Sequence, residues 1–525
     1  MIFGGTILTL SHDRTNPPPS AVLVRGNKIA AVGTERELRS RFSSNGSKPE
    51  EIDLAGRTLI PGFNDNHIHA AHMGDHETRP NLDGLDAGEI VELLRSRYPD
   101  VESGEWIFGY SWDYPSVPNP HREVLDRAFP DNPVVLTQFS GHAAWLNGRA
   151  LEFFGIDSST PNWPKGSVLK DENGQPTGVI REPTSNPRIR SFYFKRWKNR
   201  SFIEPALRAA LSLLAQVGIT SIQDNTWFPS AVPVLRDLHA EGNLTCRFTC
   251  WPYGESRTMA TLFRLHRFNP DWYALGPTKF FLDGAFSTRS AWLTEEYADE
   301  PGNYGSGRDS ATTERLLARE VRRHRQCAHH SIGDRATAEF CDAVESISAR
   351  YPSVRDLRIR IEHGQIIRHE DIPRLRDLGI LVCAQPSALA DPDKDERLLG
   401  RERAQSAYPY RSLLDAGVHL SFGSDFPGEH VYDPIRSIHM VVNRTGPESI
   451  TAMEALRCYT AESAYAEGSE DRKGTIEVGK LADLAVLSED ITAVDPSKIQ
   501  DVRVDRTIVD GVTVWARTPR YAGAL

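Results

Sequence analysis

The sequence has few cysteines and no long apolar run. Its six cysteines, spread over 525 residues, are Cys246, Cys250, Cys327, Cys341, Cys383 and Cys458. They are too scattered for a disulfide framework, and the Cys246–Cys250 spacing, which would suit a metal knuckle, has no second pair. The residues around this pair alternate between apolar and polar, so we interpret both as buried strand cysteines. No stretch approaches the roughly 20 apolar residues of a membrane span, so no membrane partner is expected.

Positive charge is also scarce relative to negative charge. The formal net charge is −10, and no long basic run is present. This balance argues against nucleic acid or an anionic membrane as a partner. Residues 1–6 lack a basic region followed by an apolar signal core, so secretion is not expected. Together with the sparse cysteines, this predicts a reducing, cytoplasmic location.

The sequence does contain enough apolar residues for a large folded enzyme. Hydrophobic residues make up 39% and charged residues 25%, as in a soluble globular protein of a large domain and an accessory one. Both ends are rich in predicted strands, at residues 2–10, 21–32, 482–487, 502–509 and 512–516. Asp510-Gly511 is a tight-turn dipeptide between the last two. We therefore predict a small β-sandwich domain built from residues 1–57 plus 474–525.

The middle of the chain alternates strands and helices. Strands are predicted at 133–141, 219–223, 278–282, 326–330, 358–363, 380–385 and 418–425, and helices at 204–217, 313–325, 337–349 and 372–377. This alternation predicts an α/β fold, specifically a (β/α)₈ TIM barrel over residues 58–473. An open doubly wound sheet is the alternative, but no Gly-x-Gly-x-x-Gly turn supports it. Residues from about 73 to 200 are too many for one barrel connection, so we expect a large insertion over the barrel mouth.

Ionisable residues stand where several predicted strands end. His67 and His69 are separated by one residue on an extended segment, so their imidazoles share a face. Neutral imidazoles that converge in this way suit a divalent transition metal. Four further residues of ligand type lie in or after later strands, namely Lys279, His330, His363 and Asp425. Each alone could be a core histidine, a turn carboxylate or an edge lysine. Because the parallel strands of a barrel end on one face, residues at the ends of several strands converge there. The positions of these candidate residues therefore favour a metal site.

The segments around these residues form a series of motifs. They are residues 61–69 (PGFNDNHIH), 109–113 (GYSWD), 141–147 (GHAAWLN), 279–285 (KFFLDGA), 330–336 (HSIGDRA), 360–365 (RIEHGQ), 423–427 (GSDFP) and 474–484 (GTIEVGKLADL). In content and order, they resemble the metal-dependent amidohydrolase superfamily, specifically amidohydrolase family 3, the YtcJ-like proteins. The resemblance covers essentially the whole chain.

The resemblance implies a site for two divalent metal ions, with Zn²⁺ as the expected metal. His67, His69 and Asp425 would bind one ion, and His330 and His363 the other. Lys279 matches the family lysine that CO₂ converts to a carbamate bridging the metals. Carbamate formation needs a neutral amine, which a dry pocket beside two dications would favour.

The implied reaction is hydrolysis of a non-peptide C–N bond in a small-molecule substrate, either an N-acyl or N-formyl amide or a cyclic amide. Divalent metals lower the pKa of a bound water towards roughly 7. Asp425 would act as general base and then general acid. His142 would either donate to the developing oxyanion or serve a structural role.

Several alternatives stay open at this point. Deamination or ester hydrolysis would use the same residues. A metal-dependent isomerase or lyase of the same superfamily is the main alternative of another class, and a non-catalytic binding protein is the last. A homodimer is the default expectation for a soluble enzyme.

Overall fold

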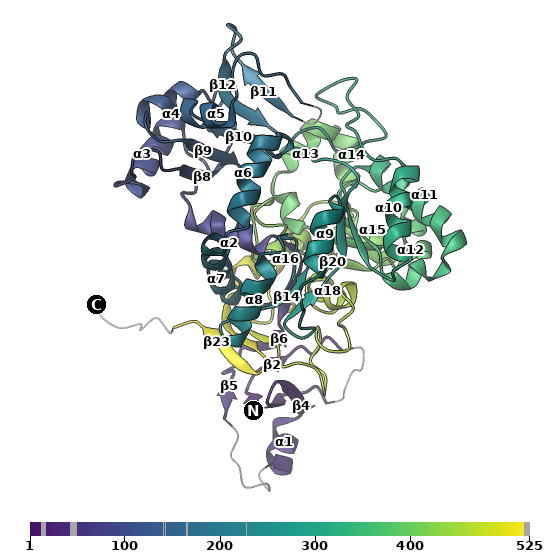
Figure 1. Ribbon diagram of the computed structural model, residues 1–525. Coiled ribbons are helices and arrows are strands. Elements are labelled where there is room, and N and C mark those ends of the chain that lie inside the picture. The colour runs from purple at the N-terminus through teal and green to yellow at the C-terminus, as the bar shows by residue number, and fades with distance from the viewer. Residues whose placement is uncertain are drawn as a thin grey trace. The chain divides into compact units, whose positions relative to one another are not determined.

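The computed structural model describes residues 1–11, 17–42, 50–139, 141, 143–163, 166–226 and 228–518. The chain is an α/β protein, as predicted, and forms two compact units (Figure 1). The first unit comprises Met1–Ile68, Leu211–Asp425 and Val431–Leu525, and the second comprises His69–Ala210 and Phe426–His430. The predicted insertion at about 73–200 falls within the range of the second unit, and the predicted domain boundaries stay predictions.

Two parallel sheets lie at the centre of the first unit. Their strand orders are β15-β14-β13-β7 and β16-β17-β18-β19-β20. Nearly every position in these strands is buried, as expected for parallel strands covered by helices. The strands are β7 (Phe63–Ile68), β13 (Ile219–Asp224), β14 (Arg247–Cys250), β15 (Tyr273–Leu275), β16 (Thr278–Phe281), β17 (Cys327–Ser331), β18 (Arg360–His363), β19 (Leu381–Ala384) and β20 (Leu420–Phe422).

Helices alternate with these strands along the chain. The four predicted helices correspond to α7, α10, α11 and α12, which confirms the strand–helix alternation. Closure of the two sheets into a (β/α)₈ barrel stays a prediction. The helices are α7 (Arg200–Gln216), α8 (Ala231–Ala240), α9 (Arg257–Arg264), α10 (Ser310–Val321), α11 (Asp334–Arg350), α12 (Ile372–Leu378), α13 (Pro392–Leu399), α14 (Arg401–Ser406), α15 (Tyr410–Asp415), α16 (Pro434–Asn443), α17 (Ala452–Cys458) and α18 (Ala461–Ala466).

Both ends of the chain contribute to two further sheets, with strand orders β4-β3-β1-β5 and β2-β6-β21-β22-β23. One buried cluster joins residues of both sheets, from Ile2 to Ile508. The turn at Asp510-Gly511 connects β22 to β23, as predicted. The sandwich arrangement itself stays a prediction. The elements are β1 (Ile2–Phe3), β2 (Thr6–Ile7), β3 (Ala21–Arg25), β4 (Lys28–Gly33), α1 (Glu35–Phe42), β5 (Ile52–Asp53), β6 (Thr58–Pro61), β21 (Leu484–Leu487), β22 (Val504–Val509) and β23 (Val512–Ala516).

A buried arginine ties the C-terminal strands to the parallel sheet. Arg247 of β14 donates from Nε to Asp483 Oδ2 at 2.6 Å and from Nη2 to Asp483 Oδ1 at 3.1 Å. The same Nη2 donates to Asp510 at 2.7 Å. The side chains of Arg247 and Asp483 are only 4% and 3% exposed. The buried charges of Arg247 and Asp483 are therefore stabilised by each other and not by water.

Replacing Arg247 with methionine is expected to destabilise the fold by about 3–5 kcal/mol, because Asp483 would stay buried without its counter-charge. Thermal melting should show a clear drop in Tm. Arg503→Met, at an exposed position between β21 and β22, is the matched control and should melt as the wild type. Equal melting of the two variants would contradict the assigned role.

The second unit contains one mixed sheet of order β11-β12-β10-β9-β8. Successive β8 residues point to opposite faces: Ile107 packs with α3 and α4, and Phe108 packs with α5 and α6. These elements, which run from purple through blue towards teal in Figure 1, are α2 (Ala70–Thr78), α3 (Ala87–Arg97), β8 (Ile107–Trp112), α4 (Arg122–Ala128), β9 (Val134–Gln138), β10 (Ala143–Leu146), α5 (Gly148–Phe154), β11 (Ser167–Lys170), β12 (Pro176–Arg181) and α6 (Pro187–Trp197).

One detail of the prediction differs from the observed second unit. The strand predicted at 133–141 forms β9, which pairs with β8 and β10 in the mixed sheet and is not a strand of the parallel sheets. An apolar run alone cannot identify the sheet to which it belongs. All six cysteines are buried with free thiols, which confirms the predicted burial of Cys246 and Cys250. Of the helices in the described part of the chain, none has the length and apolar character needed to cross a membrane.

Candidate metal centre

Five of the predicted ligands come together in the first unit. His67 lies in β7, Lys279 in β16 and His330 in β17, whereas His363 ends β18 and Asp425 follows β20. His67 Nε2 is 3.4 Å from Lys279 Nζ and 3.4 Å from Asp425 Oδ1. His67 and Lys279 are each only 1% exposed. Residues from four different strands therefore meet at one buried point.

The two later histidines complete this group. The rings of His330 and His363 have centroids 4.3 Å apart, and those of His363 and His67 are 5.2 Å apart. His363 Nδ1 is 3.9 Å from Asp425 Oδ2. Burial lowers the pKa of His67 to about 4 and that of His363 to about 3. The imidazoles are therefore neutral near pH 7, the form that binds a metal.

His69 is the first residue of the second unit and is separated from His67 by Ile68 alone. The assignment of both histidines to one ion with Asp425 stays a prediction. A set of imidazoles and a carboxylate is a donor set that zinc accepts.

One ring nitrogen shows that the site fits a metal. Nε2 of His363 is buried and has no hydrogen-bond partner among the described residues. A buried polar atom without a partner costs about 1–3 kcal/mol. Coordination of a cation would satisfy this nitrogen. The orphaned atom, the neutral imidazoles and the nearby carboxylate together fit a divalent metal.

Two of these residues have an unusual backbone. His363 has a φ of +77° and Asp425 a φ of +51°. Non-glycine residues rarely adopt the left-handed region, and those that do cluster at functional sites. In a regular strand, Glu362 and His363 would point to opposite faces. Yet Glu362 contacts His67 and His363 lies beside it, so the local backbone brings both side chains to one side.

A network of buried charged side chains, which was not predicted, lies behind His67. Glu362 Oε2 lies 2.5 Å from His67 Nδ1, and Arg360 donates to Glu362 at 2.6 and 3.1 Å. Burial raises the pKa of Glu362, but the charge of Arg360 and the hydrogen bond with His67 outweigh this effect and hold the pKa well below its usual range. The carboxylate therefore keeps the His67 proton on Nδ1 and leaves the Nε2 lone pair for a metal. The sequence signal for this network is the pair of opposite charges, Arg360 and Glu362, within the predicted strand at 358–363.

Glu362→Gln is expected to weaken metal affinity by about 10–100-fold, because the amide no longer orients and polarises the His67 ring as a carboxylate does. Competition with a chromogenic chelator measures the affinity directly. Glu345→Gln serves as control, since its side chain is 49% exposed and pairs with Arg374. An unchanged affinity in Glu362→Gln would remove Glu362 from the metal centre.

Lys279 has the environment that a reactive amine needs. Its Nζ lies 5.9 Å from the Trp251 ring and 5.2 Å from the Phe281 ring. Burial lowers the pKa of Lys279 to about 8, although the carboxylates of Glu362 and Asp425 act in the opposite direction. A substantial fraction of the amine is therefore neutral at mildly alkaline pH. The carbamate on Lys279 stays a prediction.

Two further buried residues position the centre and were missed from the sequence. Asp65 accepts hydrogen bonds from the backbone N–H groups of His67 and Ser424, both at 3.0 Å. It thus fixes the end of β7 against the loop that carries Asp425. Asn225 Nδ2 lies 3.1 Å from His67 Nε2. The predicted catalytic residue His142 lies outside the described residues.

Comparison with known proteins identifies close relatives over the full chain. The group described as "Amidohydrolase family" matches residues 50–515. The "Putative amidohydrolase YtcJ" of Bacillus subtilis is 29% identical, over 98% of this chain and 99% of that protein. The "N-substituted formamide deformylase" of Arthrobacter pascens is 30% identical, over 99% of this chain and 98% of that protein. The crystal structure of an uncharacterized metal-dependent hydrolase from Pyrococcus furiosus is 27% identical with a TM-score of 0.76, over 95% of this chain and 99% of that one.

Proposed function

Since the chain belongs to the amidohydrolase family, we propose that it uses a metal-activated water to cleave an N-acyl or N-formyl amide, or a cyclic amide. The protein is a hydrolase of carbon–nitrogen bonds. The proposal of a metal-activated water rests on one buried group of side chains, in which Nε2 of His363 has no hydrogen-bond partner among the described residues. The group consists of His67, Lys279, His330, His363 and Asp425. The full-length similarity to a formamide deformylase supports an N-formyl substrate.

The proposal includes closure of the two parallel sheets into one (β/α)₈ barrel. At one junction, Asp425 N donates to His67 O at 2.6 Å, which joins the segment after β20 to β7. At the other, Tyr253 and Lys279 form a parallel bridge, which joins the segment after β14 to β16. The barrel strands would then be β7, β13, β14, β16, β17, β18, β19 and β20. Such a barrel places ligands at strand ends on one face.

We assign the ligands as the donor geometry suggests. His67, His69 and Asp425 would hold one metal ion, His330 and His363 a second, and a carbamate on Lys279 would bridge them. Bound Zn²⁺ would polarise the substrate carbonyl and lower the pKa of a water. Two carboxylates lie near His67: Glu362 is held by Arg360 and by Nδ1 of His67, whereas Asp425 lies beside Nε2, the nitrogen that would face a metal.

Asp425 is the group best placed to move protons. Its side chain is 17% exposed, whereas His67 is 1% exposed. Asp425 therefore reaches both the buried ligands and a bound substrate. We assign it the removal of a proton from the attacking water and delivery of that proton to the leaving amine.

The test is a product analysis in ¹⁸O-water with the zinc- and bicarbonate-treated enzyme. N-benzylformamide, N-benzylacetamide, hydantoin and phenyl acetate sample the formamide, amide, cyclic amide and ester classes. Release of benzylamine with ¹⁸O in the formate or acetate supports the proposal. Turnover confined to the ester would overturn the substrate class. Conversion of any substrate without ¹⁸O incorporation would indicate isomerase or lyase chemistry instead.

A further inference from the structure

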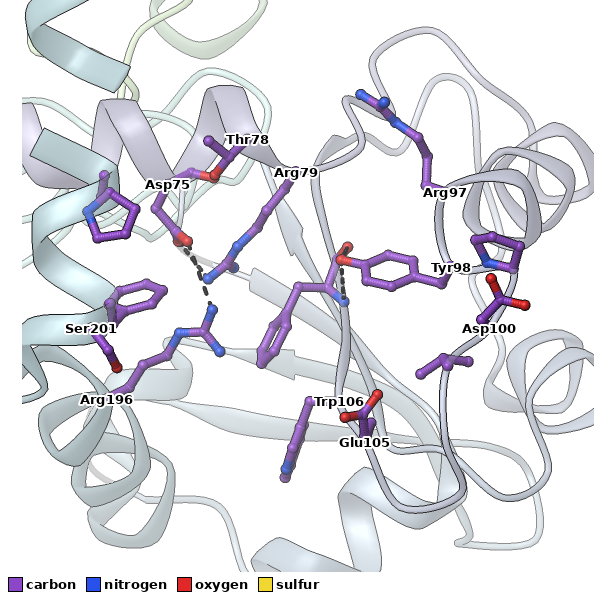
Figure 2. Close-up of a pocket in the computed structure, with 16 residues that line it drawn as sticks. Asp75, Thr78, Arg79, Arg97, Tyr98, Asp100, Glu105, Trp106, Arg196 and Ser201 are labelled. Atoms are coloured by element: carbon purple, nitrogen blue, oxygen red, sulfur yellow. Dashed lines mark hydrogen bonds and ion pairs between the residues drawn. The ribbon is translucent and has the colours of Figure 1, made fainter. Parts of the chain in front are cut away.

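A cavity in the second unit has two arginines that share one carboxylate at its inner wall (Figure 2). The cavity measures about 760 Å³, and none of its 16 lining residues is a candidate metal ligand. Asp75 of α2 pairs with Arg79 at 2.5 Å and with Arg196 of α6 at 3.8 Å. The side chains of Asp75 and Arg79 are only 5% and 6% exposed. This cluster of three charges carries a net charge of +1.

Aromatic rings hold the Arg196 guanidinium in place. Its central carbon lies 4.2 Å from the Phe108 ring centroid and 4.0 Å from that of Phe202. Arg79 lies over the same Phe108 ring at 4.5 Å. Cation–π contacts of this kind fix a guanidinium without using its N–H donors. The donors of Arg196 are therefore pre-oriented.

One donor of the half-buried Arg196 side chain lacks a hydrogen bond. Its Nε is buried and has no hydrogen-bond partner among the described residues, and its closest carboxylate oxygen is 3.8 Å away. Burial, and then repulsion from Arg79, lowers the pKa of Arg196 to about 10. The group therefore still carries its proton at pH 7. An anion would supply both the missing acceptor and the missing counter-charge.

The rest of the cavity limits what that anion can be. Trp106, Phe108 and Phe202 contribute aromatic surface to one part of the lining, with aliphatic Val101 and Pro205 nearby. The remaining charged lining residues, Arg97, Asp100 and Glu105, are exposed and together carry a net charge of −1. They therefore offer no net attraction to a second negative charge outside the arginine pair. A ligand with one anionic group and an apolar body fits this arrangement.

We propose that this cavity binds a small organic monocarboxylate with an aromatic or aliphatic body, its carboxylate on the Arg79–Arg196 pair. The ligand displaces no residue of the metal centre and needs no metal. The site is thus a second ligand site beyond the hydrolytic function, and the proposal does not depend on that function.

The test uses the metal-free full-length chain, so that no carboxylate can bind to zinc. Isothermal titration with 3-phenylpropionate should give saturable binding, whereas the neutral 3-phenylpropionamide and inorganic phosphate should bind at least about tenfold more weakly. Arg196→Met should weaken 3-phenylpropionate binding by about tenfold or more. Asp75→Asn should strengthen it, because the ligand would no longer compete with a carboxylate. Arg190→Met, at an exposed position on the same helix α6, should bind as the wild type.

Three results would overturn the proposal. They are absence of saturable binding, equal binding of the acid and the amide, and wild-type affinity in a folded Arg196→Met variant. Preferred binding of inorganic phosphate would also overturn the carboxylate assignment. If Arg196→Met fails to fold by circular dichroism, the acid–amide comparison and the Asp75→Asn variant still decide the question.

Discussion

Asp425→Asn is expected to reduce turnover by about 10³-fold while the fold is kept, because asparagine retains the shape of the side chain but cannot accept the proton from water. The left-handed backbone at this position favours the replacement, since asparagine tolerates positive φ better than most residues. Steady-state kinetics on the best substrate from the amide panel measures the loss. Elemental analysis should show that most of the metal is retained.

The control for this variant is Asp415→Asn, in which the altered side chain is 67% exposed and pairs with Arg411. It should match the wild type in both turnover and metal content. Near-normal turnover in Asp425→Asn would refute the assigned proton-transfer role. Loss of all metal would indicate that Asp425 acts as a ligand before it acts as a base.

Lys279→Met is expected to lower metal content from two equivalents per chain to one and turnover by at least about 100-fold, because methionine fills the same buried space without offering a bridging anion. Elemental analysis of protein purified without chelator, after incubation with zinc and bicarbonate, measures the stoichiometry. Two equivalents in the variant would exclude Lys279 as the bridge. Lys498→Met, at an exposed position far along the chain from the proposed ligands, is the control and should keep the wild-type metal content and turnover.

The pKa of Lys279 sets the direction in which carbamate formation should depend on pH. Since burial lowers the Lys279 pKa to about 8, the amine is protonated and unreactive below this pH and neutral above it. An ordinary lysine, with a pKa of about 10.4, would stay protonated over the same range. In metal-free protein with ¹³C-bicarbonate, the carbamate carbon signal should therefore rise with a midpoint near pH 8. A midpoint above pH 10, or no signal, would contradict a reactive Lys279.

The strand ends of the metal centre could be predicted because their signal is local. An apolar run that stops at a histidine or aspartate marks both the end of a strand and a candidate ligand, and β17 and β18 follow this pattern. The structure also distinguishes the two neighbouring histidines of β17. His329 is buried between Phe280 and Phe340, whereas His330 lies beside His363.

The supporting residues could not be predicted because their partners are distant in sequence. Glu362 contacts His67 across 295 positions, and Ser424 contacts Asp65 across 359. Each residue alone reads as a buried polar group of unknown purpose. The positive φ of His363 is equally invisible, because no glycine or turn motif marks a left-handed backbone at this position. The arginine pair of the second unit carries no sequence motif at all.

The antiparallel pairing of β6 with β21 has a consequence for the order of folding. These strands exchange hydrogen bonds although they lie about 420 residues apart along the chain. β6 leads through Gly62 directly into β7, and Gly62 N donates to Asp483 O at 2.9 Å. Contacts of such long sequence separation form late, because the loop-closure entropy must be overcome first. During synthesis, β6 can therefore pair with β21 only after residue 487 has emerged, whereas β7, which carries His67, can pair with β13 much earlier.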